Sequence, residues 1–170
     1  MGLIGVIAMF FKFGDYELEI DVERTRQFYL ESIQDLTEGC DCPGCRNFRK
    51  AYEQMSREVK SFFWKLGVDI LKAPDMSVYY GNSEKQTLFY NGFVHLCGEI
   101  LKDGALRTIV TPNQTQIEAE SWYVIAEECS VMFTKDCALL ESGFPAPVIQ
   151  MEVCMDIPWV LDGEKHALLM

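Results

Sequence analysis

Residues 40–67, CDCPGCRNFRKAYEQMSREVKSFFWKLG, combine the strongest periodic signal in the chain with its one cluster of cysteines. Apolar side chains recur at helical spacing from Phe48 to Leu66, and charged side chains fill the positions between them. This pattern predicts a single helix over residues 46–66, with Gly67 as its C-terminal stop. The aromatic residues on its apolar face are typical of a helix packed into a core.

The segments on either side of this helix predict the fold class. An apolar run over residues 5–13 and a strictly alternating run over 16–22 predict a β-hairpin, and residues 23–34 have helical spacing. After Pro74 the pattern is that of strands. We expect them at residues 77–80, 86–90, 93–101, 105–111, 121–128, 130–134 and 147–155, with Asn91-Gly92 as a hairpin turn. The order predicts an α+β fold in one domain, residues 1–170: an N-terminal β-hairpin, two helices, then a mostly antiparallel multi-stranded sheet.

Composition excludes several classes of protein. The chain has 170 residues, of which 49% are hydrophobic, so it can form a packed core and is not intrinsically disordered. Its net charge of −11 argues against nucleic-acid binding and against adsorption to anionic membranes. The apolar N-terminus lacks the basic region of a signal peptide and is too short to span a bilayer. We therefore expect a cytoplasmic protein with reduced thiols, which also suits the odd number of cysteines, 7.

The charge is unevenly distributed along the chain. Residues 1–45 carry 3 basic and 9 acidic groups, residues 46–111 carry 10 and 7, and residues 112–170 carry 2 and 10. An acidic C-terminal third is either a solvated surface or a surface that attracts a basic protein partner. From the second interpretation we derive the hypothesis that the protein binds a basic protein partner.

The cysteine cluster, Cys40, Cys42 and Cys45, has three interpretations. The Cys-x-x-Cys spacing is typical of a zinc site, with Cys40 as a third ligand and a distant fourth from His95 or, alternatively, Cys97. A thiol redox pair is the second interpretation, since a helix N-terminus stabilises a thiolate, although the βαβ context of such pairs is missing. The third is a purely structural turn.

Motifs for catalysis are absent from the sequence. It has no glycine-rich dinucleotide or phosphate loop, no His-Glu-x-x-His and no Gly-x-Ser-x-Gly. The favoured hypothesis is therefore a non-enzymatic, acidic, protein-binding module, similar in role to an immunity protein that neutralises a basic toxin, with zinc at the cysteine cluster. The alternative is a thiol- or metal-dependent enzyme that uses Cys42, Cys45 and His95.

Four segments, residues 19–29, 40–48, 62–69 and 90–98, resemble a group of small bacterial proteins. The shared features are a Cys-x-Cys-x-x-Cys-x-Asn-aromatic core and a later Tyr-x-Gly-x-x-His-x-x-Gly segment. The resemblance implies no activity. It draws attention to Asn47 and Tyr90 beside the cysteines and His95.

Overall fold

The computed structural model describes residues 7–32, 40–104, 108–118 and 121–170. Three α-helices lie in the first half of the chain and most of the strands follow them. The helices are α1 (Val22–Glu31), α2 (Pro43–Tyr52) and α3 (Arg57–Leu66). The strands are β1 (Met9–Phe13), β2 (Tyr16–Ile20), β3 (Asp75–Asn82), β4 (Thr87–Lys102), β5 (Thr108–Thr111), β6 (Gln114–Ile117), β7 (Tyr123–Ala126), β8 (Cys129–Thr134) and β9 (Val148–Pro158). Short 3-10 turns, η1 (Ile70–Lys72) and η3 (Ala167–Leu169), complete the order.

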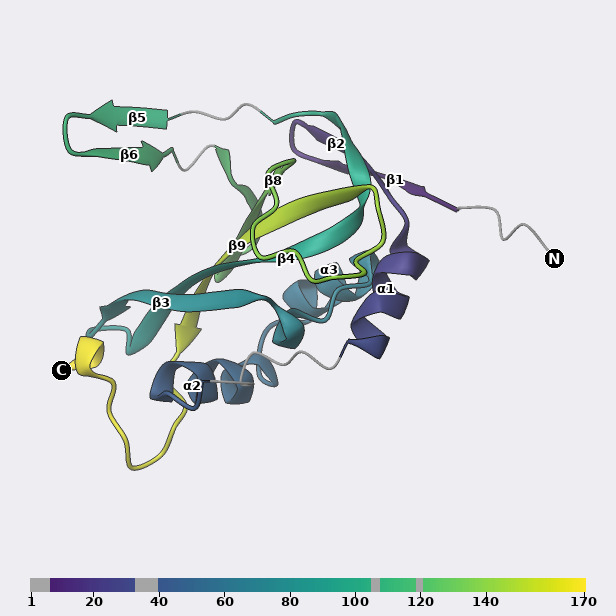
Figure 1. Cartoon of the computed structure of the whole chain (residues 1–170). Coiled ribbons are helices and arrows are strands. Elements are labelled where there is room, and N and C mark those ends of the chain that lie inside the picture. The colour runs from purple at the N-terminus through teal and green to yellow at the C-terminus, as the bar shows by residue number, and fades with distance from the viewer. Residues whose placement is uncertain (1–6, 33–39, 105–107, 119–120) are drawn as a thin grey trace.

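The strands form one large antiparallel sheet and one separate hairpin. The sheet has the order β1-β2-β4-β9-β8-β7, and β3 also pairs with β4, whereas β5 and β6 pair only with each other. In Figure 1 the three helices lie below the sheet, on one of its faces. The predicted α+β class, with its N-terminal hairpin and mostly antiparallel sheet, is confirmed.

Strand β4 is the centre of the sheet because it pairs with β9 from Thr87 to Cys97 and with two further strands on its other edge. On its other edge, β3 pairs with Thr87–Phe93 and β2 with Gly98–Lys102, which leaves a gap around His95 and Cys97. Two side chains of α1 fill the gap. The Cys97 N–H donates to Thr25 Oγ1 at 3.0 Å, while Tyr29 Oη accepts from the His95 N–H at 3.1 Å and donates to the His95 carbonyl at 2.9 Å. Helix α1 thus replaces a missing strand, and the buried backbone groups stay paired.

The expected hairpin turn at Asn91-Gly92 was wrong, because both residues lie inside β4. The turn between β3 and β4 lies at residues 83–86 instead, where Asn82 Oδ1 accepts from the N–H groups of Glu84 and Lys85. Glycine at position 92 has a different cause. A Cβ there would lie 2.1 Å from the carbonyl oxygen of Asp75 on β3, so only glycine allows the two strands to approach.

The expected single helix over residues 46–66 was also wrong in its extent. The structure has two helices, α2 and α3, and α3 begins at its own N-cap, Ser56, whose hydroxyl accepts from the Val59 N–H. Each of the two helices buries its own apolar side chains, and the spacing of these side chains along the sequence stays helical across the break. Gly67 ends α3 in the left-handed conformation, as predicted.

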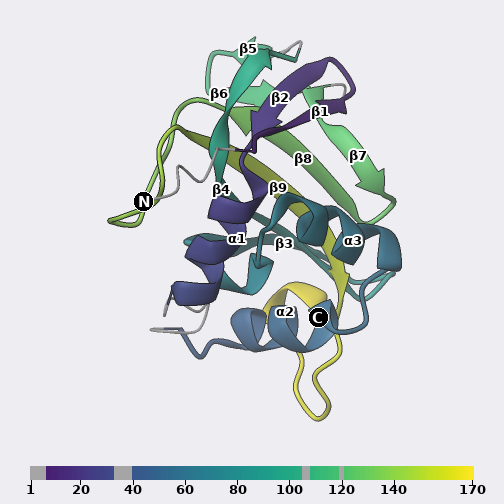
Figure 2. The same ribbon diagram turned by 90° about the vertical axis from the view of Figure 1, so that its right-hand side faces the viewer.

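The sheet is strongly curved, so that its two edge strands approach one another. The Phe13 ring at the end of β1 lies 5.3 Å from the Tyr123 ring of β7 and 5.2 Å from the Phe62 ring of α3, between centroids. Figure 2 shows the β1–β2 hairpin beside β7 and β8, with α3 beneath them. None of the helices in the described part of the chain is long and apolar enough to cross a membrane.

Candidate metal centre

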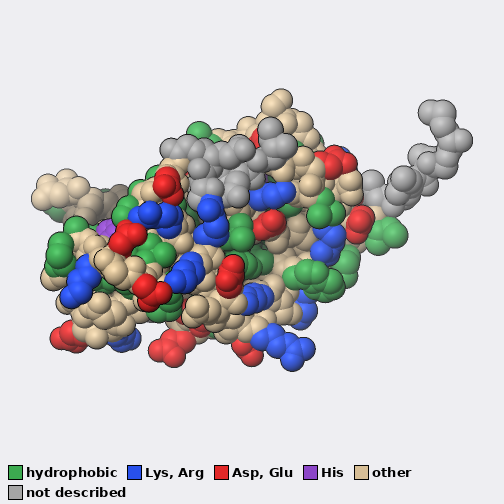
Figure 3. Space-filling view, turned by 90° about the horizontal axis from the view of Figure 1, so that it is seen from below, with side chains coloured by type: hydrophobic (Ala, Val, Ile, Leu, Met, Phe, Trp, Pro, Cys, Tyr) green, Lys and Arg blue, Asp and Glu red, His purple; other side chains and the backbone are tan. Residues whose placement is uncertain are grey.

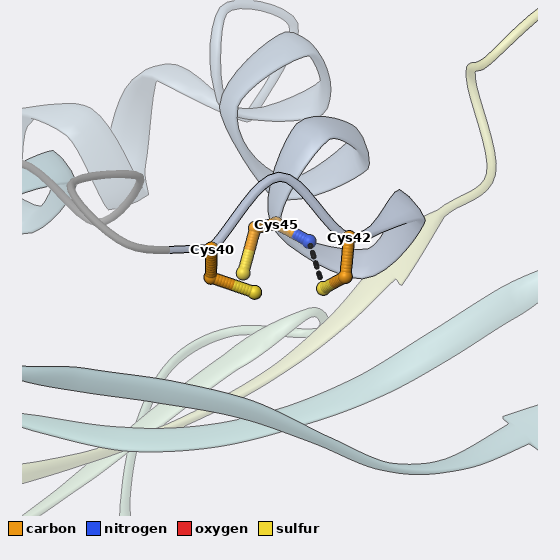
Figure 4. Close-up of side chains that lie close together, drawn as sticks. All are labelled: Cys40, Cys42 and Cys45. Carbon is orange, nitrogen blue, oxygen red and sulfur yellow. Dashed lines mark hydrogen bonds between the residues drawn. The ribbon is translucent and has the colours of Figure 1, made fainter.

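The three clustered cysteines lie at the start of α2, at the edge of the helical layer (Figure 4). Cys42 is the N-cap of the helix, and Pro43 is its first residue, where proline is favoured because it lacks an N–H that would need a partner. The Cys-Pro-Gly-Cys segment is therefore the first turn of the helix. Cys45 projects from that turn toward the other two thiols.

The thiols converge closely. The sulfur atoms of Cys40, Cys42 and Cys45 all lie within 4.8 Å of one another. Cys42 Sγ also accepts a hydrogen bond from the Cys45 N–H, 3.5 Å away. Cys42 is exposed and Cys45 is partly buried, so the cluster can be reached from solvent.

The environment gives the thiols of Cys42 and Cys45 different pKa values. Burial acts to raise the pKa of Cys42. Hydrogen bonds from the Cys45 and Gly44 N–H groups and from the neighbouring thiols outweigh it, so this pKa is lowered. Burial, followed by the hydrogen bonds to Cys40 and Cys42, raises the pKa of Cys45 to about 12. Cys42 is consequently the thiol of this pair that is more readily ionised.

A buried hydrogen-bonded unit holds the first turn of α2 against the sheet. The Tyr90 hydroxyl of β4 donates to the Gly44 carbonyl at 2.8 Å. The fully buried Asn47 side chain donates to the carbonyl of Pro158 at 3.1 Å and accepts from the Val160 N–H at 2.8 Å. These bonds tie the cysteine helix to β4, to the end of β9 and to the chain that follows it.

Gly44 has a packing role that the sequence did not reveal. A Cβ at this position would lie 2.9 Å from Val78 Cγ2 on β3, so glycine allows the helix to pack this close to the sheet. The apolar spacing predicted a helix start at residue 46, whereas α2 begins at Pro43. The helical signal was present in proline itself, since a proline directly after a capping residue is typical of a helix start.

The structure does not bring the expected fourth ligands to the thiols. The pairing of β4 with β9 is continuous from Thr87 to Cys97, so Tyr90 and His95 point to opposite faces of the sheet. Tyr90 faces α2, whereas the His95 ring lies 5.7 Å from that of Phe144 and its Nε2 lies 3.3 Å from Gln150 Oε1. Neither His95 nor Cys97 belongs to the group of converging thiols.

The arrangement suits a thiophilic metal ion. A tetrahedral zinc ion with Zn–S bonds of about 2.3 Å places its sulfur ligands roughly 3.8 Å apart, so a small movement of three side chains would complete three of its bonds. The N-terminus of α2 favours the negative charge that ionised thiols bring. The described residues that converge here supply three ligands, all of them cysteines.

The fold and this site define an α+β protein with a three-cysteine cluster at a helix N-terminus. No protein-family model, no curated protein and no solved structure matches the chain. The geometry of the site is therefore the basis for a functional proposal.

Proposed function

We propose that the protein is a non-enzymatic binding protein in which Cys40, Cys42 and Cys45 hold a structural zinc ion. The convergence of three sulfur atoms within 4.8 Å carries the proposal. A redox pair needs two thiols, and a purely structural turn needs none, whereas zinc uses all three. Bound zinc would link residue 40 to the first turn of α2. A water molecule or a further side chain would complete the tetrahedron.

Metal analysis tests this site. Protein purified without added metal is expected to contain one zinc per chain, and Cys42→Ser and Cys45→Ser are expected to lose it. Cys137→Ser is the matched control, because Cys137 lies in the loop after β8. His95→Gln is expected to keep its zinc, since His95 lies on the other face of the sheet. Wild-type protein without zinc, or cysteine variants that retain it, would contradict the proposal.

A thiol enzyme is the second candidate, favoured by the lowered pKa of the exposed Cys42 beside the partly buried Cys45. In such an enzyme the Cys42 thiolate attacks a substrate disulfide and releases one thiolate. Cys45 then attacks Cys42 Sγ and releases the second, which leaves a Cys42–Cys45 disulfide. Alkylation of metal-free protein distinguishes the two candidates. Rapid modification of Cys42 near neutral pH, together with an absence of zinc, would favour exchange chemistry.

The binding partner that we propose is a basic protein. The net charge of −11 supports this choice, because charge of one sign steers association with the opposite sign. Figure 3 views the helix side of the molecule and shows Lys and Arg side chains interspersed with Asp and Glu. Affinity purification with the intact protein should recover a partner of basic isoelectric point, and the affinity should fall as salt is added. A partner held equally well at high salt would contradict this part of the proposal.

A further inference from the structure

A cavity of about 560 Å³ lies on the face of the sheet that the helices leave free. Its sheet residues come from three neighbouring strands. Asn91 belongs to β4, Glu152 to β9 and Met132 to β8, and the strand register places all three on one face. Trp122 supplies an aromatic wall, and Asp136 a second carboxylate.

The described lining of the cavity is acidic. Among the described residues that line it, two are acidic and none is Lys or Arg. Burial raises the pKa of Glu152, and the nearby Asp75 raises it further, while a hydrogen bond from Gln150 has the opposite effect. A partly buried carboxylate without a cation is an unfavourable arrangement that a positively charged ligand would relieve.

The position of the Glu152 carboxylate is fixed from behind. Gln150 Nε2 donates to Glu152 Oε1 at 2.5 Å, while Gln150 Oε1 accepts from the Ala138 N–H at 2.7 Å. The same oxygen lies 3.3 Å from His95 Nε2, so this ring nitrogen is the one that carries a proton and donates it to Gln150. Burial lowers the pKa of His95, so this ring adds no positive charge behind the cavity at neutral pH.

We infer that this cavity is a socket for an arginine side chain of the basic partner, an inference that rests on the proposed function. The guanidinium group can pair with Glu152, and its planar face can lie against Trp122. Asp136 at the same cavity adds attraction, and the aliphatic part of the side chain can pack on Met132. Arginine suits the site better than lysine, because its flat, weakly hydrated group combines aromatic stacking with paired hydrogen bonds.

Titration with short blocked peptides tests the socket on the intact protein. The first probe is a pentapeptide of four glycines around one arginine. The second is the same peptide with citrulline, which is uncharged, in place of arginine. The third is agmatine, which carries a guanidinium group and a free amine but no peptide backbone. In NMR spectra the arginine peptide should shift the Trp122 indole signal, and the citrulline peptide should bind about tenfold more weakly or worse. Equal binding of the two peptides would overturn the inference. Tighter binding of agmatine would assign the cavity to a free amine and also overturn it.

Matched variants separate the socket from general acidity. Glu152→Gln keeps the shape of the side chain and an acceptor for Gln150, and it should weaken the arginine peptide about tenfold or more. Glu127→Gln makes the same change of charge at the exposed β7–β8 turn and should leave the affinity within about twofold. Equal effects of both variants would overturn the socket. A salt-sensitive basic partner that Glu152→Gln does not weaken would also overturn the socket while leaving the proposed function intact. Failure to find any basic partner would remove the proposed function itself.

Discussion

At the scale of single residues, Glu152 and His95 show how burial shifts the pKa values of two groups that share one hydrogen-bonded neighbour. Gln150 lies between them, with its amide nitrogen on the carboxylate and its oxygen near the imidazole. Burial acts in opposite directions on the two pKa values, because it disfavours the charged form of each group. Burial therefore favours a neutral His95, against the hydrogen bond with Gln150, at a point where the sequence suggested a metal ligand.

The raised pKa of Glu152 predicts a measurable effect on stability. A carboxyl group whose pKa is higher in the folded state stabilises the protein when protonated, and this contribution is lost as the pH rises through that pKa. Glu152→Gln should therefore raise the free energy of unfolding at pH 7, relative to the wild type. The difference should vanish below about pH 4, where the wild-type carboxyl is protonated in both states. Urea denaturation across this range provides the measurement.

Glu127→Gln is the control for this experiment, because Glu127 is exposed. It should have the same stability as the wild type at both ends of the pH range. If Glu152→Gln were less stable at pH 7, the ionised carboxylate would be a stabilising structural group, and the socket would lose its physical basis.

At the scale of secondary-structure elements, the unusual feature is the part of β4 that pairs with a helix on one edge. Thr25 and Tyr29 of α1 supply the partners that a strand would have supplied between β2 and β3. Lys72 in turn donates to the carbonyls of Tyr29 and Ser32 at the end of α1, at 2.5 and 2.7 Å. A cation at this end of a helix also interacts favourably with the helix dipole. Hydrogen bonds to the sheet and to η1 thus fix the position of helix α1.

Tyr29→Phe should reveal the contribution of this helix to the sheet. The change removes one hydroxyl and leaves the N–H and the carbonyl of His95 without their partner, at a cost of about 1–3 kcal/mol per buried group. We expect a lower free energy of unfolding in urea and faster amide hydrogen exchange at His95. Tyr79→Phe is the matched control, because Tyr79 on β3 is 63% exposed. Unchanged exchange at His95 would show that β4 does not depend on the hydroxyl.

These elements also show what could be predicted from the sequence. The hairpin of β1 and β2 followed from alternation, and α1 followed from its spacing, because both signals are local. The break between α2 and α3 was missed since the apolar spacing runs on through it, and only Ser56 marked the new start. Asn91-Gly92 was wrongly predicted to be a hairpin turn, because an Asn-Gly pair is typical of such turns. Here the glycine is needed instead for the close approach of two strands.

The candidate site was also predictable only in its local part. Three cysteines within six positions must lie close in space, so their convergence required no knowledge of the fold. A fourth ligand from β4 did require it, because the choice between Tyr90 and His95 depends on which face of the strand meets α2. The cavity beside Glu152 could not be foreseen, since strands far apart in the sequence build it.

At the scale of the whole molecule, self-repulsion should limit stability. The net charge is −11, and ion pairs such as Arg46–Glu164 at 2.7 Å and Lys50–Asp162 at 3.4 Å lie at partly or fully exposed positions. Exposed pairs contribute little, whereas the repulsion acts across the entire surface.

Added salt should therefore raise the melting temperature. Sodium chloride at about 0.15 M screens charges beyond roughly 8 Å, compared with about 30 Å at 0.01 M, so repulsion between distant carboxylates weakens first. We expect a higher melting temperature at the higher concentration, measured by circular dichroism, and the same shift with potassium chloride. A fall in the melting temperature would show that attractive pairs dominate.

The hydrogen bonds of Asn47 also have a consequence for folding during synthesis. Asn47 and Pro158 are 111 positions apart, and β4 pairs with β9 from Thr87 to Cys97. A ribosome must therefore deliver residues 148–160 before the Asn47 bonds and the β4–β9 pairing can form. Contacts of such long range slow folding, because a long loop must close before any of them forms. Until residues 158–160 are made, the helix that carries the thiols lacks its Asn47 bonds, so a metal ion or an oxidant can reach these thiols before the docking is complete.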